Sequence, residues 1–187
     1  FRSIPGGVTE TAVITAANDT LEAWAIITDS FEVNHVAGDR FVDAGSGSDL
    51  LNNCLVVDRP CRTVGYGLGQ ASSGDTVRLA GGTYREHDLL LNKTITVSGG
   101  WSTNPDHDSY WGLSDPELQP EPDVNLTVID AQGAGRVLEI VGSPTVEGLT
   151  LRGGATAGSG GGAFISSGSP VLRNTNILSN TADGYGG

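Results

Sequence analysis

The loop Asp43–Asp49, with the sequence DAGSGSD, contains side chains that could hold a metal ion. Calcium prefers carboxylate and backbone carbonyl oxygens, and Asp43 and Asp49 would supply the carboxylates. The loop lacks the spacing and the final glutamate of an EF-hand, so a glycine-serine turn is the other interpretation. A second stretch, DHD at residues 106–108, is more typical of ordinary surface. The sequence requires no cofactor, and calcium is the one ion that it allows.

Three aromatic residues, Trp101, Tyr110 and Trp111, could form a platform on which a sugar ring stacks. They lie in the stretch Trp101–Asp123, which is rich in proline and acidic residues and is typical of a long loop. Long loops in compact domains often carry function. The alternative, which we favour, is that the rings pin this loop to the wall of the domain.

Three asparagines, Asn18, Asn92 and Asn125, each begin an N-x-S/T sequence. Such sequences accept glycans in secreted eukaryotic proteins. In a bacterial protein they would arise by chance from threonine-rich strands, which is the interpretation that we favour.

The two cysteines, Cys54 and Cys61, are close together in the stretch NNCLVVDRPCRT. We expect a disulfide that closes a small loop, and this would indicate an oxidising compartment. Two buried free thiols are the alternative. A zinc site is disfavoured, because two cysteines do not complete a zinc shell and the nearest histidines, His35 and His87, are distant in sequence.

The composition suits many short strands joined by tight turns. The 187 residues include 28 glycines, and the net charge is −12, with Lys93 as the single lysine. A surface of this sign repels phosphate backbones and acidic membranes, which argues against a nucleic-acid partner. No run of about 18 apolar residues is present, so we expect no membrane-spanning helix.

The chain divides into three parts by pattern. Residues 1–40 form a strand-like extension, with a helix over residues 18–26 as the weaker alternative. Residues 41–75 hold the cysteine loop and then Val64, Leu68 and Ala71, whose spacing predicts a short helix despite three glycines. Residues 76–187 repeat a unit of two apolar residues before a small-residue bend, interrupted by the loop at residues 101–123.

The repeated unit has no helix and ends at glycine corners. Its apolar pairs are Val77 and Leu79, Ile95 and Val97, and Leu149 and Leu151. The distance from Gly161 to Gly186 is 25 residues, and periods of about 20 to 50 residues mark repeat architectures. Such units cannot bury their inner faces alone, so we expect them to stack as coils around one shared core.

Residues 41–187 resemble secreted right-handed parallel β-helix proteins of the pectate-lyase-like superfold. The segment from FVDAGSGSDLL to SGDTVRLAGGTY is similar to their N-terminal cap, and ITVSGGW, VEGLTLRGG and GGGAFISSG are similar to their coils. The GGA and asparagine pattern also resembles polymorphic outer-membrane-protein repeats. The resemblance implies an all-β solenoid with a short capping helix. It implies little about function, because this fold carries enzymes, adhesins and surface-layer proteins.

Lyases of this superfold use clustered acids to hold calcium and a basic residue to remove a proton from the sugar. The outward candidates are Arg78, Asp130, Glu139, Glu147, Arg152 and Arg173. Arg78, Arg152 and Arg173 could stack along one face, and Glu139 and Glu147 could be the two carboxylates that glycoside hydrolysis needs. No dense acidic pair accompanies the arginines in the sequence, so solvated outward faces are the favoured interpretation.

We therefore expect a non-enzymatic structural or adhesive protein of the cell surface or the extracellular space. Its partner would be a second copy, joined head to tail into a filament through the open coil edge and residues 1–40, or a cell-surface polysaccharide. The alternative is a carbohydrate-active protein, either a polysaccharide lyase or a binding module. A calcium-dependent loss of polymer viscosity, abolished by changing Arg152 or Arg173, would favour the lyase.

Overall fold

The computed structural model shows the chain as two compact units, residues 1–36 and residues 37–187. The structure describes residues 9–13, 26–30, 38–104, 111 and 120–186. The predicted boundary at residue 40 lies inside the first strand of the second unit, β3 (Asp39–Val42). The extension is therefore somewhat shorter than predicted.

The N-terminal unit contains one antiparallel pair of strands. β1 (Thr9–Val13) pairs with β2 (Ile26–Ser30). The prediction of extended chain is confirmed for these two segments, and most of the alternative helix over residues 18–26 lies outside the described residues. A two-stranded hairpin is at best marginally stable alone in water.

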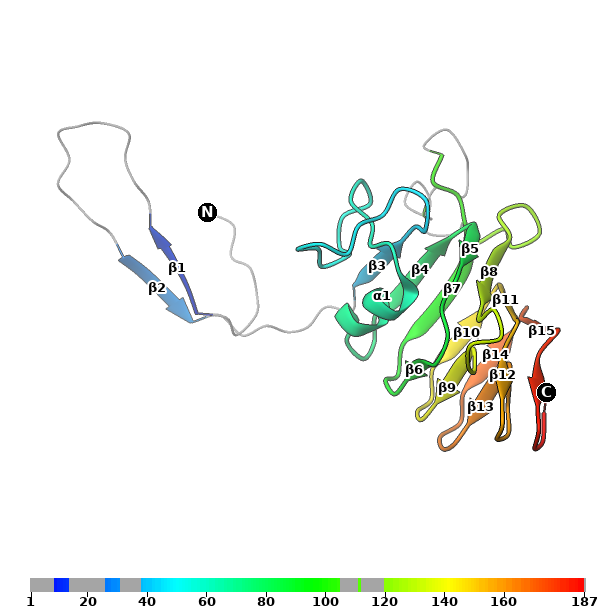
Figure 1. The fold of residues 1–187 in the computed structure, drawn as a ribbon. Helices are drawn as coiled ribbons and strands as arrows, with labels where there is room; N and C mark the ends of the chain where they lie inside the picture. The colour runs from blue at the N-terminus through cyan, green and yellow to red at the C-terminus, as the bar shows by residue number, and fades with distance from the viewer. Residues whose placement is uncertain (1–8, 14–25, 31–37, 105–110, 112–119, 187) are drawn as a thin grey trace, which may run out of the picture. The chain divides into compact units, whose positions relative to one another are not determined.

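Parallel strands form three main sheets in the second unit (Figure 1). The five-stranded sheet has the order β14-β10-β7-β4-β3, the four-stranded sheet β15-β11-β8-β5, and the three-stranded sheet β13-β9-β6. Their further bounds are β4 Thr76–Ala80, β5 Gly82–Tyr84, β6 Leu89–Leu91, β7 Thr96–Trp101, β8 Thr127–Asp130, β9 Leu138–Ile140, β10 Thr145–Glu147, β11 Leu149–Arg152, β13 Ala163–Ile165, β14 Val171–Arg173 and β15 Asn176–Leu178. Every pairing within these sheets is parallel. The predicted all-β class is thus confirmed as a mostly β fold of parallel strands.

Consecutive strands along the chain belong to different sheets. β7 lies in the five-stranded sheet, β8 in the four-stranded sheet and β9 in the three-stranded sheet, and β10 returns to the first. A short parallel pair, β12 (Ala155–Thr156) with β16 (Thr181–Ala182), repeats the pattern in a connection. From β4 onward, each circuit of the chain therefore adds one strand to each main sheet.

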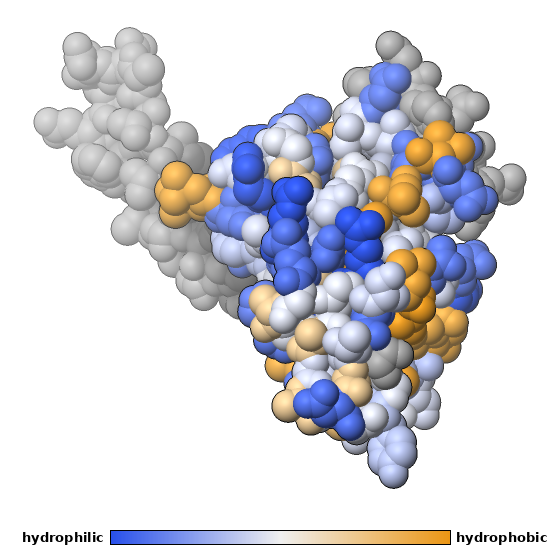
Figure 2. All heavy atoms as spheres, turned by 45° about the vertical axis from the view of Figure 1, so that its right-hand side comes forward, coloured by the Kyte–Doolittle hydropathy of each residue, from blue (hydrophilic) through white to orange (hydrophobic). Residues whose placement is uncertain are grey.

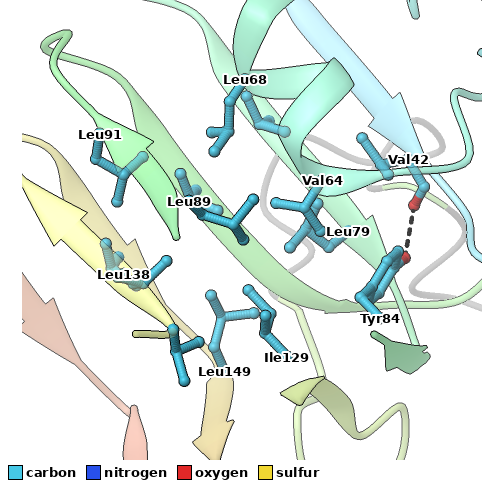
Figure 3. Packing of buried hydrophobic residues seen from close by; sticks show 14 of the residues in the cluster. Val42, Val64, Leu68, Leu79, Tyr84, Leu89, Leu91, Ile129, Leu138 and Leu149 are labelled. Atoms are coloured by element: carbon cyan, nitrogen blue, oxygen red, sulfur yellow. Dashed lines mark hydrogen bonds between the residues drawn. The ribbon is translucent and has the colours of Figure 1, made fainter. Parts of the chain in front are cut away.

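Alternate strand residues point inward and form rows that run through the unit. One row in the four-stranded sheet is Tyr84, Ile129, Leu151 and Ile177, each paired with the next. Figure 3 shows how side chains of different strands meet in one cluster. The predicted inward residues are all buried: Val77, Leu79, Ile95, Val97, Leu149 and Leu151. The period-two pattern was therefore sufficient to identify the core.

The predicted capping helix is confirmed as α1 (Val64–Gln70), whose apolar face is buried. Its first free amides are bonded by the carboxylate of Glu86, at 2.6 Å and 2.8 Å. Its last carbonyls are bonded by the ammonium group of Lys93, which donates to three of them at 2.6–3.2 Å. Both ends of the helix are thus satisfied by side chains from the strands beneath it.

Two of the helix glycines predict opposite effects of substitution by alanine. A Cβ atom at Gly67 would lie 2.6 Å from Cγ2 of Val42, whereas one at Gly69 would meet nothing within 4 Å. We expect Gly67→Ala to lower the free energy of unfolding by about 1–3 kcal/mol through overpacking. We expect Gly69→Ala to raise it by about 0.5–1 kcal/mol, because alanine loses less backbone freedom on folding. Urea denaturation of both variants checks this, and equal effects would contradict it.

The main sheets end, in the described chain, at β13, β14 and β15, and we call these three strands the free edge. Each of them pairs on one side only. The inward residues Ile165 and Ile177 are 50% and 49% exposed there, although their partners Ile140 and Leu151 are fully buried. Figure 2 brings this end forward and shows orange apolar residues on it. The rows of the core thus continue into an uncovered surface.

Candidate functional site

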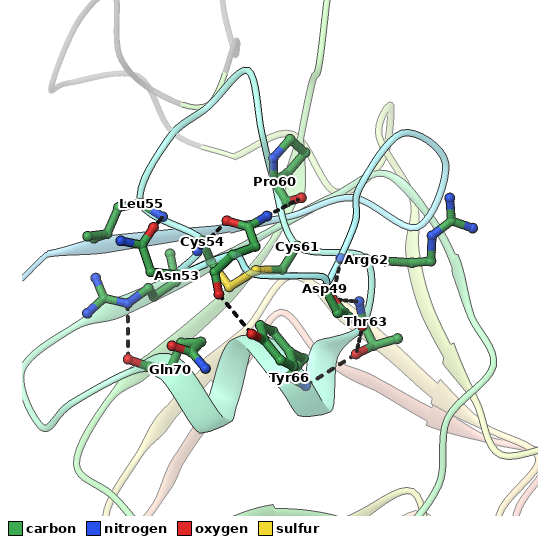
Figure 4. The surroundings of a disulfide bond; sticks show 12 residues. Asp49, Asn53, Cys54, Leu55, Pro60, Cys61, Arg62, Thr63, Tyr66 and Gln70 are labelled. Carbon is green, nitrogen blue, oxygen red and sulfur yellow. Dashed lines mark hydrogen bonds between the residues drawn. A yellow bond between two sulfur atoms is a disulfide. The ribbon is translucent and has the colours of Figure 1, made fainter.

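The predicted disulfide is present between Cys54 and Cys61, and both cysteines are fully buried (Figure 4). The loop that it closes is also held by Asn52, whose amide donates to the carbonyls of Ser48, Arg59 and Pro60 at 2.8–3.0 Å. The hydroxyl of Tyr66 on α1 donates to the carbonyl of Asn52 at 2.9 Å. The loop is therefore a rigid part of the cap, and its disulfide fits an oxidising setting.

The two predicted calcium ligands serve the backbone of the cap. The carboxylate of Asp43 accepts from the amides of Gly45 and Ser46 and from the Ser46 hydroxyl. The carboxylate of Asp49 accepts from the amides of Arg62 and Thr63 and from the Thr63 hydroxyl. Within the described residues, the structure brings no three His, Cys, Asp or Glu side chains together as metal ligands. The glycine-serine turn is thus the better description of this loop, and residues 106–108 lie outside the described residues.

The predicted aromatic platform is wrong for Trp101 and Trp111, because both rings are buried. Only 5% of Trp101 and 1% of Trp111 is exposed, and Trp111 packs edge-on against Phe41 with ring centroids 5.2 Å apart. A sugar cannot stack on a ring that the protein covers. The alternative, that these rings pin the loop to the domain, fits the structure; Tyr110 lies outside the described residues.

Arg78 belongs to this buried aromatic cluster. Its guanidinium group lies 4.4 Å from the centroid of the Trp101 ring and donates to the carbonyl of Trp111. It also forms an ion pair with Asp39 at 3.1 Å. The stem of the long loop is thus tied to the five-stranded sheet through one cation.

The other predicted arginines also form ion pairs, and each pair joins neighbouring strands. Arg152 lies 2.9 Å from Asp130, and Arg173 lies 2.5 Å from Glu147. Arg78 and Arg173 share a row of the five-stranded sheet, but Arg152 belongs to the four-stranded sheet, so the prediction of one stacked face is wrong.

The two carboxylates proposed for hydrolysis lie in different sheets. Glu139 is in β9 of the three-stranded sheet and Glu147 is in β10 of the five-stranded sheet. Glu139 is paired with Arg136 at 3.5 Å, whereas Glu147 is paired with Arg173. The strands therefore do not place them as neighbours in one row, and each carboxylate has a cation of its own.

Three groups around the cap have shifted pKa values. Burial raises the pKa of the Glu86 carboxyl, although the amides at the start of α1 donate to it. Burial also raises the pKa of the Tyr84 hydroxyl, which donates to two backbone carbonyls at 2.9 Å and 3.0 Å. The hydrogen bond with His87 lowers the pKa of Asp88. These contacts are internal to the domain, so their titration bears on its stability.

The two described sequons differ in accessibility. Asn92 is exposed, beside the lysine that caps α1. Asn125 is half-buried, and its amide donates to the carbonyl of Gly100 at 3.4 Å. Asn18 lies outside the described residues. A glycan on Asn125 would break a contact that holds the base of the long loop.

A groove of about 710 Å³ lies where the five-stranded sheet turns into the four-stranded sheet. One wall is the base of the long loop, and the floor is formed by the corners of two successive circuits. The lining residues are Pro122, Asp123, Leu126, Gly148, Leu149, Thr150, Asn174, Thr175 and Asn176. A smaller hollow of about 320 Å³ shares Pro122, Gly148 and Asn174, and it adds Pro120, Glu147 and Arg173.

The groove is held in place by backbone contacts. The amide of Glu121 donates to the carbonyl of Gly100 at 2.9 Å, which fixes the wall against the corner of the preceding circuit. In the two corners that form the floor, Gly148 and Asn174 both have positive φ angles, of 67° and 49°. Sequence reasoning missed this site, because it depends on which corner carries the loop. The signals were the prolines at 120 and 122 and an asparagine where the other circuit has glycine.

Comparison of the chain with protein-family models, with curated proteins and with solved structures found no match. No helix in the described part of the chain is long and apolar enough to cross a membrane.

Proposed function

We propose that residues 37–187 form a right-handed parallel β-helix and that the protein is a non-enzymatic, extracellular structural or adhesive element. The circuits through three parallel sheets support the helical stack. Residues paired between neighbouring circuits near the free edge are regularly spaced along the chain, as Leu138 with Ala163 and Val146 with Leu172 are. A stack of this kind extends by adding equivalent coils.

The pairing of the outward charges supports a structural role. Arg78, Arg152 and Arg173 each contact a carboxylate on a neighbouring strand at 2.5–3.1 Å. A general base must instead have its proton-accepting atom turned toward a substrate. The charged side chains that the sequence offers for catalysis are thus used to join one circuit to the next.

The observation that carries the proposed assembly is the free edge. Its strands present unpaired backbone groups, and its inward residues Ile165 and Ile177 are half exposed. Such an edge is a template for another strand layer. A second copy can supply that layer, with strands of its N-terminal unit adding to the sheets. A head-to-tail contact of this kind does not close and generates a filament.

Sedimentation velocity and negative-stain electron microscopy of the protein test this proposal. We expect concentration-dependent assemblies, and we expect the double variant Ile165→Lys/Ile177→Lys to abolish them, because edge lysines prevent strand addition. Leu90→Lys is the matched control: Leu90 is 49% exposed but lies on the outer face of β6, away from the free edge. Monomers at every concentration, or equal loss in the control, would refute the assembly.

A further inference from the structure

The groove between the long loop and the coil corners has a lining of neutral polar side chains that the protein itself does not use. Asparagines elsewhere bond the backbone: the amide of Asn180 accepts from Gly154 at 2.7 Å and donates to Leu151 at 3.0 Å. In contrast, the exposed amides of Asn174 and Asn176 make no hydrogen bond to any part of the chain that the structure describes. Both groups are therefore available to a ligand.

The spacing of these groups follows the stack. Asn176 on β15 is paired with Thr150 on β11, and Arg173 on β14 is paired with Glu147 on β10. Neighbouring strands lie about 4.8 Å apart, so each row presents polar groups at that interval along the groove. Side chains repeated in this way match an extended ligand better than a compact one.

The charges of the groove select against an acidic ligand. Arg173 is the one cation among the lining residues, and Glu147 already neutralises it at 2.5 Å. Asp123 adds a carboxylate, and the whole chain carries a net charge of −12. An anion entering here would meet repulsion without a free partner.

The remaining wall is apolar. Pro120 and Pro122 line it, together with Leu126, of which 54% is exposed. Sugars present hydroxyl groups at their edges and C–H groups on their faces. Amides and a hydroxyl on one side of a groove with proline and leucine on the other can satisfy both.

From this lining we infer that the groove binds a neutral, hydroxyl-rich glycan chain lying along the stack. Asn174 and Asn176 donate to and accept from its hydroxyls, while Pro122 and Leu126 pack against its C–H faces. The inference rests on the adhesive part of the proposed function and names the class of molecule to which the protein would adhere. The groove lies beside the coils, so glycan binding and assembly at the free edge can fail independently.

Isothermal titration calorimetry with cellohexaose, mannohexaose, maltohexaose and hexagalacturonate tests this inference. We expect one or more of the neutral hexasaccharides to bind and hexagalacturonate not to bind. Asn174→Gly removes the amide and leaves a residue that accepts the positive φ angle, as Gly148 does in the other corner. We expect this variant, and Asn176→Ala, to weaken binding about tenfold each, which corresponds to about 1.4 kcal/mol.

Ser179→Gly is the matched control. Ser179 is exposed, follows β15 directly and has a φ angle of 55°, but it does not line the groove. We expect its affinity to equal that of the parent protein, and we expect all three variants to sediment like the parent. Failure of all three neutral hexasaccharides to bind at millimolar concentration would overturn the inference. So would unchanged affinity in Asn174→Gly, or binding of an extended Thr-Asn octapeptide in place of the sugars.

Discussion

Replacing Asp75 with asparagine is expected to lower the free energy of unfolding by about 3–5 kcal/mol. Asp75 forms an ion pair with Arg40 at 3.0 Å, and both side chains are almost completely buried. Asparagine has nearly the same volume, so packing is retained while the negative charge is lost. The cost arises because the guanidinium group stays buried without its counter-charge.

The contacts of this pair explain why its loss would spread through the cap. The carboxylate of Asp75 also accepts from the amides of Gly38 and Ser72, both at 2.8 Å. Arg40 donates to the carbonyl of Gln70, the last residue of α1, at 3.2 Å. One ion pair thus connects the start of β3, the end of the helix and the turn before β4.

Asp130→Asn is the control for this prediction. Its partner Arg152 lies at a similar distance, 2.9 Å, but 45% of the Arg152 side chain is exposed. Water screens such a pair, so we expect a loss below about 1 kcal/mol. Urea denaturation measures both variants. Equal losses would show that burial of the Arg40–Asp75 pair does not determine its contribution.

The sequence predicted the core well, because the core depends on local patterning. Period-two alternation identified Val77, Val97 and Leu151 as inward residues, and parallel stacking requires nothing more than that each circuit repeat this pattern. The helix was predicted from the spacing of Val64, Leu68 and Ala71 despite its glycines. The structure supplies the reason for one of them, since Gly67 lets α1 approach Val42.

The site could not be predicted in the same way, because it depends on register between circuits. Arg40 and Asp75 are 35 positions apart, and no local pattern indicates that they meet. Exposure of Trp101 was likewise misjudged, because the rings at 101 and 111 meet only when the loop folds back on β4 and β7. The groove required knowledge of which corner carries that loop.

Replacing Leu151 with alanine is expected to lower the free energy of unfolding by about 2.7–5 kcal/mol. Leu151 is fully buried in the row between Ile129 and Ile177, and the residues on both sides are held by strand pairing. A cavity left there cannot collapse easily, so the cost includes both lost burial and the empty space. Urea denaturation at low protein concentration measures it.

Ile177→Ala is the matched variant, one position further along the same row. Because Ile177 is 49% exposed, truncation removes less buried surface and opens a notch that water fills, and we expect a loss of about 1 kcal/mol in the monomer. The two variants together report on the free edge. If a second copy covers that edge, the loss for Ile177→Ala should rise toward that for Leu151→Ala as protein concentration increases, because binding adds to the stability of the folded state. A loss for Ile177→Ala that is independent of concentration would mean that the edge stays uncovered, and the proposed filament would have to be abandoned.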